Sequence, residues 1–315
     1  MATFAPARPE RLWEAPEDTR DEALYRRMRF IRRFEERLLE LFEDGVLNGT
    51  THACIGQEAN CVAVLELLDL EDHVFSNHRC HGHYLARTGD ARGLLAEIMG
   101  LPEGVCAGIG GSQHLAADGF KSNGVQGGIV PAAAGIAMSY ELSRSAAISA
   151  VFIGDGTLGE GLVYESLNLV SLWRLPLLIV VEDNGWAQST PSHLNLAGSM
   201  SGRFEAFGVA VREIDSTDVL EIAGVAEDAV SYVREQRAPC ALIIHTYRLC
   251  HHSKNDDNRP PDEVQARWAL DPLLVHGRRL APGVSARIDA EVAAAFEELV
   301  SELTNSELVA ELTNS

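Results

Sequence analysis

The chain lacks several features that would assign it to a common protein class. No apolar run approaches the roughly 20 residues that a membrane span needs, and residues 1–20 carry charges of both signs without the apolar core of a secretory signal. Basic residues are in deficit, since 26 Lys and Arg stand against 46 Asp and Glu, for a formal net charge of −20. This balance argues against a general nucleic-acid or anionic-membrane surface, although it permits a local basic pocket for a phosphate. We therefore expect a soluble cytoplasmic protein.

Paired cysteines are also absent. None of the six cysteines belongs to a Cys-x-x-Cys motif; they stand at Cys54, Cys61, Cys80, Cys106, Cys240 and Cys250. Free buried thiols in a reducing compartment are the expectation, in preference to a zinc or disulfide framework.

The pattern of apolar residues predicts an α/β fold. With 315 residues, of which 46% are hydrophobic, the chain can bury a large core. Helical periodicity covers 21–42, 56–68 and 90–99, a short strand or loop covers 72–77, and a glycine-dense loop over 100–128 leads to an alanine-rich helix from Pro131 to about Ser145. Predicted strands at 146–153, 177–182, 207–214 and 240–246 then alternate with helices at 160–173 and 219–236. This order predicts a parallel sheet flanked by helices.

No linker divides the chain. We expect an N-terminal arm over 1–20, one α/β domain over 21–275 and a helical C-terminal extension over 276–315, with a terminal helix at 285–304. The sequence Glu-Leu-Thr-Asn-Ser occurs twice in that extension, at 302–306 and 311–315. Two copies do not make a repeat fold, and we attach no function to them.

A carboxylate and an amide follow two successive predicted strands. Gly154-Asp155-Gly156 ends the first strand and Asn184 ends the next. The roughly 30 positions between them suit one crossover helix, which would bring both side chains to the carboxyl edge of a parallel sheet. Oxygen ligands beside a glycine turn suit Mg²⁺ held together with a diphosphate. Two ordinary strand-ending turns are the alternative.

Two histidine-rich segments could carry chemistry. His78-Arg79-Cys80-His81-Gly82-His83 could hold zinc through its three imidazoles, could bind an anionic phosphate through Arg79, or could be an exposed polar turn. The predicted loop 247–261 contains Cys250, His251 and His252, and paired histidines there could transfer protons near neutral pH. Cys250 beside the histidines also raises the possibility of a nucleophile, which no oxyanion motif supports. Glycines over 124–131 would let the backbone approach a flat ring closely, or would simply make flexible turns.

Taken together, these motifs resemble the α subunit of the thiamine-diphosphate-dependent first component of 2-oxo acid dehydrogenase complexes. That family includes pyruvate, branched-chain 2-oxo acid and acetoin dehydrogenases. The resemblance runs in order from about Asp21 to Trp268, through Gly56-Gln57-Glu58, Arg79-x-His81-Gly82, Gly110-Gly111-Ser112-x-His114, Gly124 to Pro131, Gly154-Asp155-Gly156 with Asn184, and Tyr247-Arg248 with His252-Ser253. Two departures stand out, because the family often has Tyr where His78 stands and Gly where Cys250 stands.

The resemblance implies roles for individual residues. Asp155 and Asn184 would ligate Mg²⁺ through side chains and Trp186 through its carbonyl. The remaining cofactor contacts would come from His78, Arg79, Gly124, Gln126, Gly154, Gly156, Thr157, Arg248 and His252. His252 would also move a proton near the substrate, with His81 a second candidate for that neighbourhood. The decarboxylation chemistry would belong to the cofactor.

The resemblance further implies a partner chain. In this family the Glu that activates the aminopyrimidine ring lies on a β chain, and this sequence leaves no room for a second, pyrimidine-binding domain. We expect two α and two β chains, a small 2-oxo acid substrate, and an acyl acceptor that is a lipoyl-bearing acyltransferase core or an acyl carrier protein. Acetoin cleavage is the nearest alternative activity. A non-catalytic nucleotide-binding protein is the alternative from another class, although Gly108-Ile109-Gly110-Gly111 follows no predicted strand.

Overall fold

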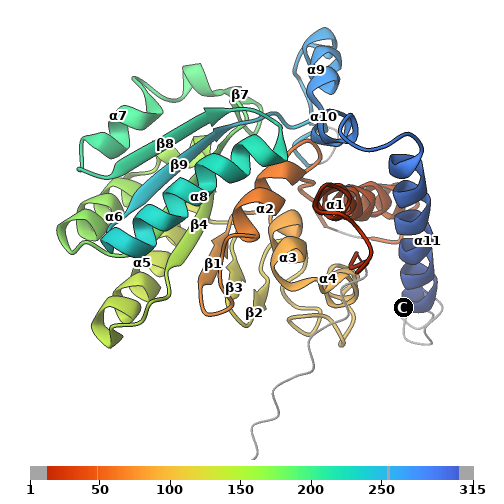
Figure 1. Cartoon of the computed structure of the whole chain (residues 1–315), viewed down its shortest axis with the longest axis horizontal. Helices are drawn as coiled ribbons and strands as arrows, with labels where there is room; N and C mark the ends of the chain where they lie inside the picture. Colours follow the sequence, from red (N-terminus) through yellow and green to blue (C-terminus); the bar gives the residue numbers. More distant parts are fainter. Residues whose placement is uncertain (1–12, 48, 254–255, 305–315) are drawn as a thin grey trace, which may run out of the picture.

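A mostly parallel β-sheet lies at the centre of the molecule (Figure 1). The computed structural model describes residues 13–47, 49–253 and 256–304. Within these residues the sheet has seven strands in the order β2-β3-β1-β4-β5-β9-β8, and only the β2–β3 pair is antiparallel. The strands are β1 (His73–Ser76), β2 (Ala116–Ala117), β3 (Phe120–Ser122), β4 (Ser149–Gly154), β5 (Leu177–Asp183), β8 (Ala210–Asp215) and β9 (Cys240–His245). The predicted parallel sheet is confirmed.

The central strands β4 and β5 are apolar because both of their faces are covered. Residues 149–153 and 177–182 are buried without interruption, which is typical of a parallel sheet between two helical layers. Alternate side chains serve two separate cores: Phe152 and Leu178 join the larger core, whereas Val151 and Ile179 join the other. In the register of this pair Gly154 lies opposite Glu182, so both strands end at the same edge.

Helices form a layer on each face of the sheet (Figure 1). One layer contains α2 (Glu58–Leu65) and α8 (Val219–Gln236), and the other contains α5 (Gln126–Ser143), α6 (Gly161–Leu172) and α7 (Met200–Glu205). The long helix α1 (Arg20–Glu43) extends the first layer together with α3 (His81–Thr88) and α4 (Ala91–Ile98). Thr19 and Glu22 form a reciprocal capping box that fixes where α1 begins.

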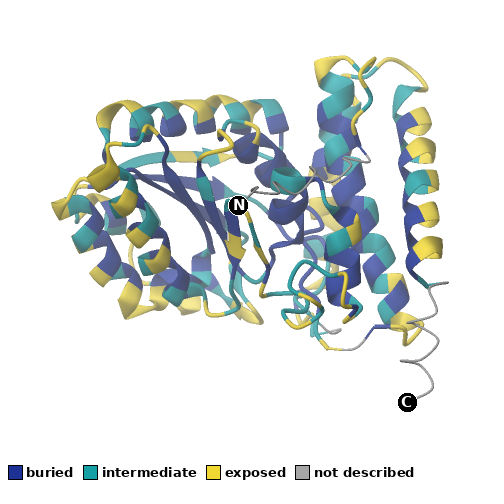
Figure 2. Ribbon diagram, turned by 90° about the horizontal axis from the view of Figure 1, so that it is seen from below, coloured by how far each residue is buried: buried dark blue, intermediate teal, exposed yellow. Residues whose placement is uncertain are grey.

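The last two helices of the C-terminal segment pack on the long helix α1 (Figure 2). That segment consists of α9 (Pro261–Arg267), α10 (Pro272–Gly277) and α11 (Val284–Thr304). Phe296 of α11 meets Phe30 and Phe34 of α1 edge to face, with ring centroids 6.0 and 5.5 Å apart. The described part of the predicted extension therefore shares the core of the α/β domain. Most of the predicted N-terminal arm and the second copy of Glu-Leu-Thr-Asn-Ser lie outside the described residues.

The structure corrects one local prediction and removes one of the alternatives for the segment 78–83. The alanine-rich helix begins at Gln126 instead of Pro131, because the carboxylate of Glu160 accepts a 3.0 Å hydrogen bond from the Gly127 N–H and supports a first turn that periodicity cannot detect. The segment 78–83 is not a turn throughout, since His81 begins α3. That helix has only eight residues, and its histidines are buried, which argues against the alternative of an exposed polar turn.

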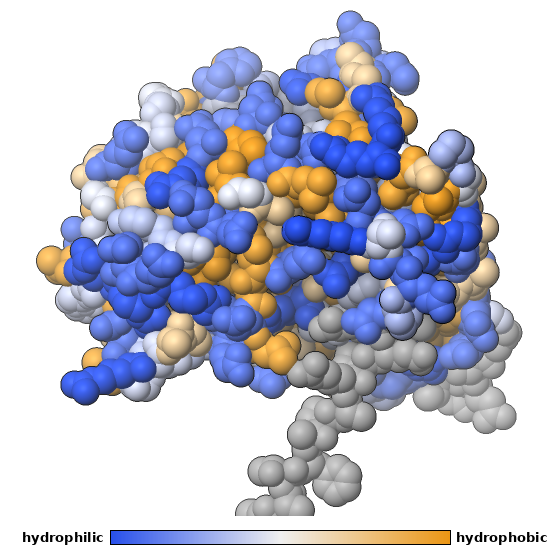
Figure 3. All heavy atoms as spheres, viewed as in Figure 1, coloured by the Kyte–Doolittle hydropathy of each residue, from blue (hydrophilic) through white to orange (hydrophobic). Residues whose placement is uncertain are grey.

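Surface composition agrees with the charge of the chain. Hydrophilic side chains cover most of the face in Figure 3, with apolar residues in scattered groups. Among the described residues, no helix combines the length and the apolar character that crossing a bilayer requires.

Glu97, a buried carboxylate of α4, organises the glycine-dense loop. Its two oxygens accept hydrogen bonds from the N–H groups of Cys106, Gly108, Gly110 and Gly111, at 2.6, 2.9, 2.6 and 3.1 Å. Successive amides that converge on one anion form a nest. The loop is therefore wound around an internal carboxylate, and its glycines bind that group instead of the phosphate of a dinucleotide.

We predict that Glu97→Gln lowers the free energy of unfolding by about 3 kcal/mol. The amide would point its own N–H groups at two of the four backbone donors and leave them unsatisfied. Urea denaturation measures the change. Glu227→Gln, an exposed position on α8, is the matched control and should change stability by less than about 0.5 kcal/mol. Equal stability of the two variants would contradict the role given to Glu97.

Candidate active site

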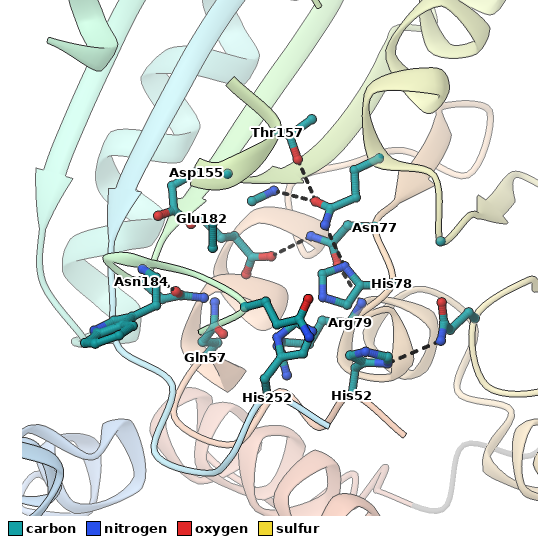
Figure 4. Close-up of a pocket in the computed structure, with 18 of the residues that line it drawn as sticks. His52, Gln57, Asn77, His78, Arg79, Asp155, Thr157, Glu182, Asn184 and His252 are labelled. Carbon is teal, nitrogen blue, oxygen red and sulfur yellow. Dashed lines mark hydrogen bonds between the residues drawn. The ribbon is translucent and has the colours of Figure 1, made fainter. Parts of the chain in front are cut away.

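A polar cavity opens at the carboxyl ends of β1, β4 and β5 (Figure 4). Its volume is about 390 Å³, and its position agrees with the general rule that open α/β sheets bind ligands beyond the carboxyl ends of their strands. The residues that line it are His52, Gln57, Asn77, His78, Arg79, Gln113, Gly124, Gln126, Gly154, Asp155, Gly156, Thr157, Glu160, Glu182, Asn184, Trp186, Ala187, Gln188 and His252. Most of the residues singled out from the sequence are therefore brought together.

One side of the cavity carries side-chain oxygen atoms that could bind a metal ion. Asp155 and Asn184 follow the neighbouring strands β4 and β5 and lie on the same side in Figure 4. Asp155 is 1% exposed, and burial raises the pKa of its carboxyl to about 6, against the effect of a hydrogen bond from Ser192. Among the described residues, no Arg or Lys forms an ion pair with it. The Oδ1 of Asn184 accepts from the Trp186 N–H at 3.1 Å and keeps a second lone pair. A buried carboxylate and an amide oxygen on the same side of the cavity fit a divalent metal ion.

The side chain of Gln126 is hydrogen-bonded to the turn after β4. Its Oε1 accepts hydrogen bonds from the Gly154 N–H at 3.2 Å and from the Thr157 hydroxyl at 2.6 Å. Gly156 must lack a side chain, because a Cβ there would lie 2.7 Å from the Cβ of Ala187. Backbone N–H groups in such a glycine turn can approach an anion closely.

The same glutamine fixes the protonation of His78. Because Oε1 of Gln126 already accepts two donors, its Nε2 faces His78 and donates to Nδ1 at 2.8 Å. Burial, followed by the charge of Arg79, places the pKa of His78 well below its ordinary value. His78 is therefore neutral, with its proton on Nε2, and this buried N–H has no partner within the described structure. It is available to donate a hydrogen bond to a ligand.

Two further histidines of the cavity, His52 and His252, also accept a hydrogen bond at Nδ1. His52 and His252 lie edge to face, with ring centroids 4.8 Å apart. Their Nδ1 atoms accept from Gln113 at 3.3 Å and from Arg79 at 3.4 Å. Burial, assisted by the charge of Arg79, lowers the pKa of His52 to about 3 and that of His252 to about 4. Both imidazoles are neutral at pH 7 and carry their protons on Nε2.

The basic side of the cavity therefore suits an anion. Arg79 is 4% exposed and supplies a full positive charge, while its guanidinium contacts the carbonyl of Ala53 and the ring of His252. Its side chain and the three histidines lie across the cavity from Asp155 and Asn184 (Figure 4). A ligand that is anionic at one end and bridged to a metal ion fits this distribution of charge.

Two predicted site residues do not line the cavity. Arg248 is 2% exposed and donates to the carbonyl of Cys250 at 2.6 Å. His81 is fully buried; one ring nitrogen lies 3.0 Å from a carboxylate oxygen of Glu35 and the other 3.0 Å from the carbonyl of Ser112. The proposed place of His81 beside the substrate is therefore incorrect, because both of its nitrogens are committed to the protein interior.

Two hypotheses drawn from the histidine segments gain no support: zinc bound by His78, His81 and His83, and Cys250 as a nucleophile. The three histidines of 78–83 diverge, since His81 contacts Glu35, His83 contacts Ser76 and His78 contacts Gln126. Burial raises the pKa of the Cys250 thiol, which disfavours the thiolate that a nucleophile needs. All six cysteines are free, and four of them are buried, whereas Cys106 and Cys250 are partly exposed.

Several lining residues were missed in the sequence. Gln57, Asn77, Glu182 and His52 are buried and contribute to the cavity. Glu182 offered a signal, because it is an acid that ends an apolar strand directly before Asp183 and Asn184. Gln57 was named only within the Gly56-Gln57-Glu58 motif and was given no role. Asn77 offered no signal, since its importance depends on which strands and helices lie beside it.

Comparisons with known proteins agree on one family. The family described as "Dehydrogenase E1 component" matches residues 26–303. The pyruvate dehydrogenase E1 component subunit alpha of Zymomonas mobilis is 39% identical over 240 residues, which cover 75% of this chain and 68% of that protein. Two acetoin:2,6-dichlorophenolindophenol oxidoreductase α subunits are each 36% identical. The Bacillus subtilis protein matches 74% of this chain and 71% of its own length, and the Cupriavidus necator protein 89% and 88%.

We predict that Arg79→Gln weakens the binding of inorganic pyrophosphate with Mg²⁺ at least tenfold. The substitution removes the only full positive charge among the lining residues of the described structure, and tenfold corresponds to about 1.4 kcal/mol. Titration calorimetry measures the affinity. Arg278→Gln, at an exposed position after α10, should leave it unchanged. Equal affinities for the two variants would show that the anion binds elsewhere.

Proposed function

Because this chain belongs to the dehydrogenase E1 component family, we propose that it is the α subunit of a thiamine-diphosphate-dependent 2-oxo acid dehydrogenase. It acts with a β subunit in oxidative decarboxylation of a 2-oxo acid and in transfer of the acyl group to a lipoyl group. The supporting observation is the charge pattern of the cavity. The carboxylate of Asp155, which has no counter-ion among the described residues, lies on one side of the cavity. The guanidinium of Arg79 and three neutral imidazoles lie on the opposite side.

The residues present fit Mg²⁺ and a diphosphate. Asp155, Asn184 and the carbonyl of Trp186 would hold the metal ion through oxygen atoms. Gly154, Gly156 and Thr157 would contact the phosphates, together with Arg79 and His78. Gly124 and Gln126 would lie beside the aminopyrimidine. When bound, the cofactor supplies the carbon nucleophile and the electron sink for decarboxylation.

His252 is the residue that we assign to proton transfer near the substrate. The charges of Arg79 and Arg248 contribute to its low pKa, after burial. An anion bound beside Arg79 would offset part of that charge and move the pKa of His252 back toward neutrality, where proton transfer is effective. Arg248 would act from behind the loop, because its guanidinium fixes the carbonyl of Cys250, two residues before His252.

A partner over the cavity mouth is consistent with apolar side chains exposed near it. Val125 is 64% exposed and adjoins the lining residues Gly124 and Gln126, and Leu162 is 40% exposed shortly after Glu160. Two such side chains do not form an apolar patch by themselves, but their burial by a partner would add to the stability of a complex. We propose that the β subunit covers them, in an assembly of two α and two β chains, and that a lipoyl-bearing acyltransferase core or an acyl carrier protein accepts the acyl group.

We predict that the chain is inactive alone and active with its β subunit. Release of carbon dioxide from pyruvate and from branched-chain 2-oxo acids should require both chains, thiamine diphosphate and Mg²⁺, because the chain supplies only part of the site. The relatives also include acetoin-cleaving enzymes, so acetaldehyde release from acetoin is assayed in parallel. Acetoin cleavage without carbon dioxide release would replace the proposed activity by that alternative. Turnover by the chain alone would overturn the need for a partner.

We predict that Asp155→Asn weakens the binding of thiamine diphosphate with Mg²⁺ at least 100-fold, about 2.8 kcal/mol. The amide cannot supply the negative charge that a hard divalent cation requires. Affinity is measured by titration calorimetry on the complex with the β subunit. Asp215→Asn, at the end of β8 on the same edge of the sheet, is the matched control and should bind normally. Normal cofactor affinity in the Asp155 variant would remove the metal site from this position.

A further inference from the structure

A buried pair of opposite charges lies directly behind the cavity. His83 of α3 is 1% exposed, and its ring lies against Phe152 of β4 with centroids 4.1 Å apart. Its Nδ1 is 2.8 Å from the hydroxyl of Ser76, and its Nε2 is 3.4 Å from a carboxylate oxygen of Glu182. Glu182 in turn lines the cavity, whereas His83 does not. The histidine is therefore placed to act on the cavity only through the carboxylate.

Glu182 links this histidine to the basic side of the cavity. One of its oxygens accepts from the side chain of Asn60 at 3.1 Å. The other accepts from the side chain of Asn77 at 3.3 Å (Figure 4). The Oδ1 of Asn77 then accepts from the backbone N–H of Arg79 at 2.8 Å. A continuous series of polar contacts runs from His83 through Glu182 and Asn77 to the residue that supplies the positive charge of the cavity.

The position of Glu182 creates an electrostatic problem. A buried carboxylate on the wall of a cavity that holds an anion repels that anion, and the low dielectric of the interior strengthens the repulsion. Hydrogen bonds from Asn60 and Asn77 favour the ionised form of Glu182. The Ser76 hydroxyl donates to the carbonyl of Asn77 at 3.5 Å, so it accepts from Nδ1 of His83, while Nε2 of His83 faces the carboxylate of Glu182. With a proton on each ring nitrogen, His83 is the positive member of a buried charged pair.

We propose that His83 is a positioning residue: as the counter-charge of Glu182, it lets a buried carboxylate orient Asn77 and Arg79 without repelling the anionic cofactor. This inference rests on the proposed function, because the anion is taken to be the diphosphate. His83 itself touches neither cofactor nor substrate. Its contribution is the positive charge, and its ring packing on Phe152 is secondary.

A metal ion is the competing explanation for the same cluster. The ligand atoms of Cys61, His83 and Glu182 lie within 4.8 Å of one another, and sulfur, nitrogen and oxygen donors of this kind can hold zinc. The ion pair accounts better for the contacts, because both oxygens of Glu182 already accept hydrogen bonds from asparagines and the Cys61 thiol donates to the carbonyl of Gln57 at 3.6 Å. Nε2 of His83 forms no hydrogen bond within the described residues and meets Glu182 only as an ion pair, at 3.4 Å.

Double-variant rescue tests the proposal. Affinity for thiamine diphosphate with Mg²⁺ is measured by titration calorimetry on the complex with the β subunit. The chains compared are the unaltered chain, His83→Gln, Glu182→Gln and the double variant, and melting temperatures are recorded for each. Glutamine at 83 keeps a hydrogen-bond donor but removes the charge. His73→Gln on β1, a partly buried histidine outside the cavity, is the matched control.

We expect His83→Gln to weaken cofactor binding at least tenfold, because it leaves Glu182 uncompensated. Glu182→Gln should weaken binding by less, and the double variant should match Glu182→Gln instead of adding the two losses. His73→Gln should bind normally. Additive losses in the double variant would overturn the proposal, since they would mean that His83 acts by packing and not by charge. Cofactor affinity unchanged in His83→Gln would overturn it directly.

Folding and metal content give independent outcomes. If His83→Gln does not fold, a double variant that folds and binds supports the charge argument, and a double variant that also fails to fold overturns it. Elemental analysis of the unaltered chain should find no zinc, and one zinc per chain that is lost in His83→Gln would replace the ion pair by a metal site. Absence of cofactor binding by the unaltered complex would instead count against the proposed function.

Discussion

The parallel pairing of β4 with β5 is the constraint on which the candidate site depends. Because Gly154 lies opposite Glu182, the residues that follow both strands emerge at the same edge of the sheet. Asp155 and Asn184 come from one strand end each, and Glu182 forms the wall between them and the basic side of the cavity. The cores on both faces hold this register, since a shift by one residue would exchange the side chains of Phe152 and Val151 between them.

Polar groups in the cavity are ordered by a few side chains that each satisfy several partners. Gln126 joins the turn after β4 to His78, and Glu182 joins α2 to the segment after β1. Such networks are stable only when their members are paired. The donor that remains unpaired at His78 and the carboxylate of Asp155 without a counter-ion therefore point toward a ligand instead of toward the protein. In the proposed function, the cofactor supplies the missing partners: an acceptor for the N–H of His78 and a metal ion for the carboxylate of Asp155.

Some of the site could be predicted from residues that are close in the sequence. Asp155 and Asn184 follow apolar strands, and Arg79 and His252 lie in unusually dense clusters of basic residues, so each carried a local signal. Asn77 and His52 did not, because their roles depend on β1 lying between β3 and β4 and on segments distant in the sequence meeting at the cavity. His81 was misplaced for the opposite reason: its cluster of basic residues carried a local signal for a site, but α3 turns His81 toward Glu35 in the interior.

The sequence by itself determined which segments form strands and helices in most of the chain, and that oxygen-bearing side chains follow two of the strands. These properties are local, since apolar periodicity and glycine turns act over a few residues. Only the tertiary structure decided which polar groups meet, that His78 keeps its proton on Nε2, and that Glu182 has His83 behind it. Hydrogen-bond partners and burial fix those properties, and the partners come from segments brought together by the order of the strands.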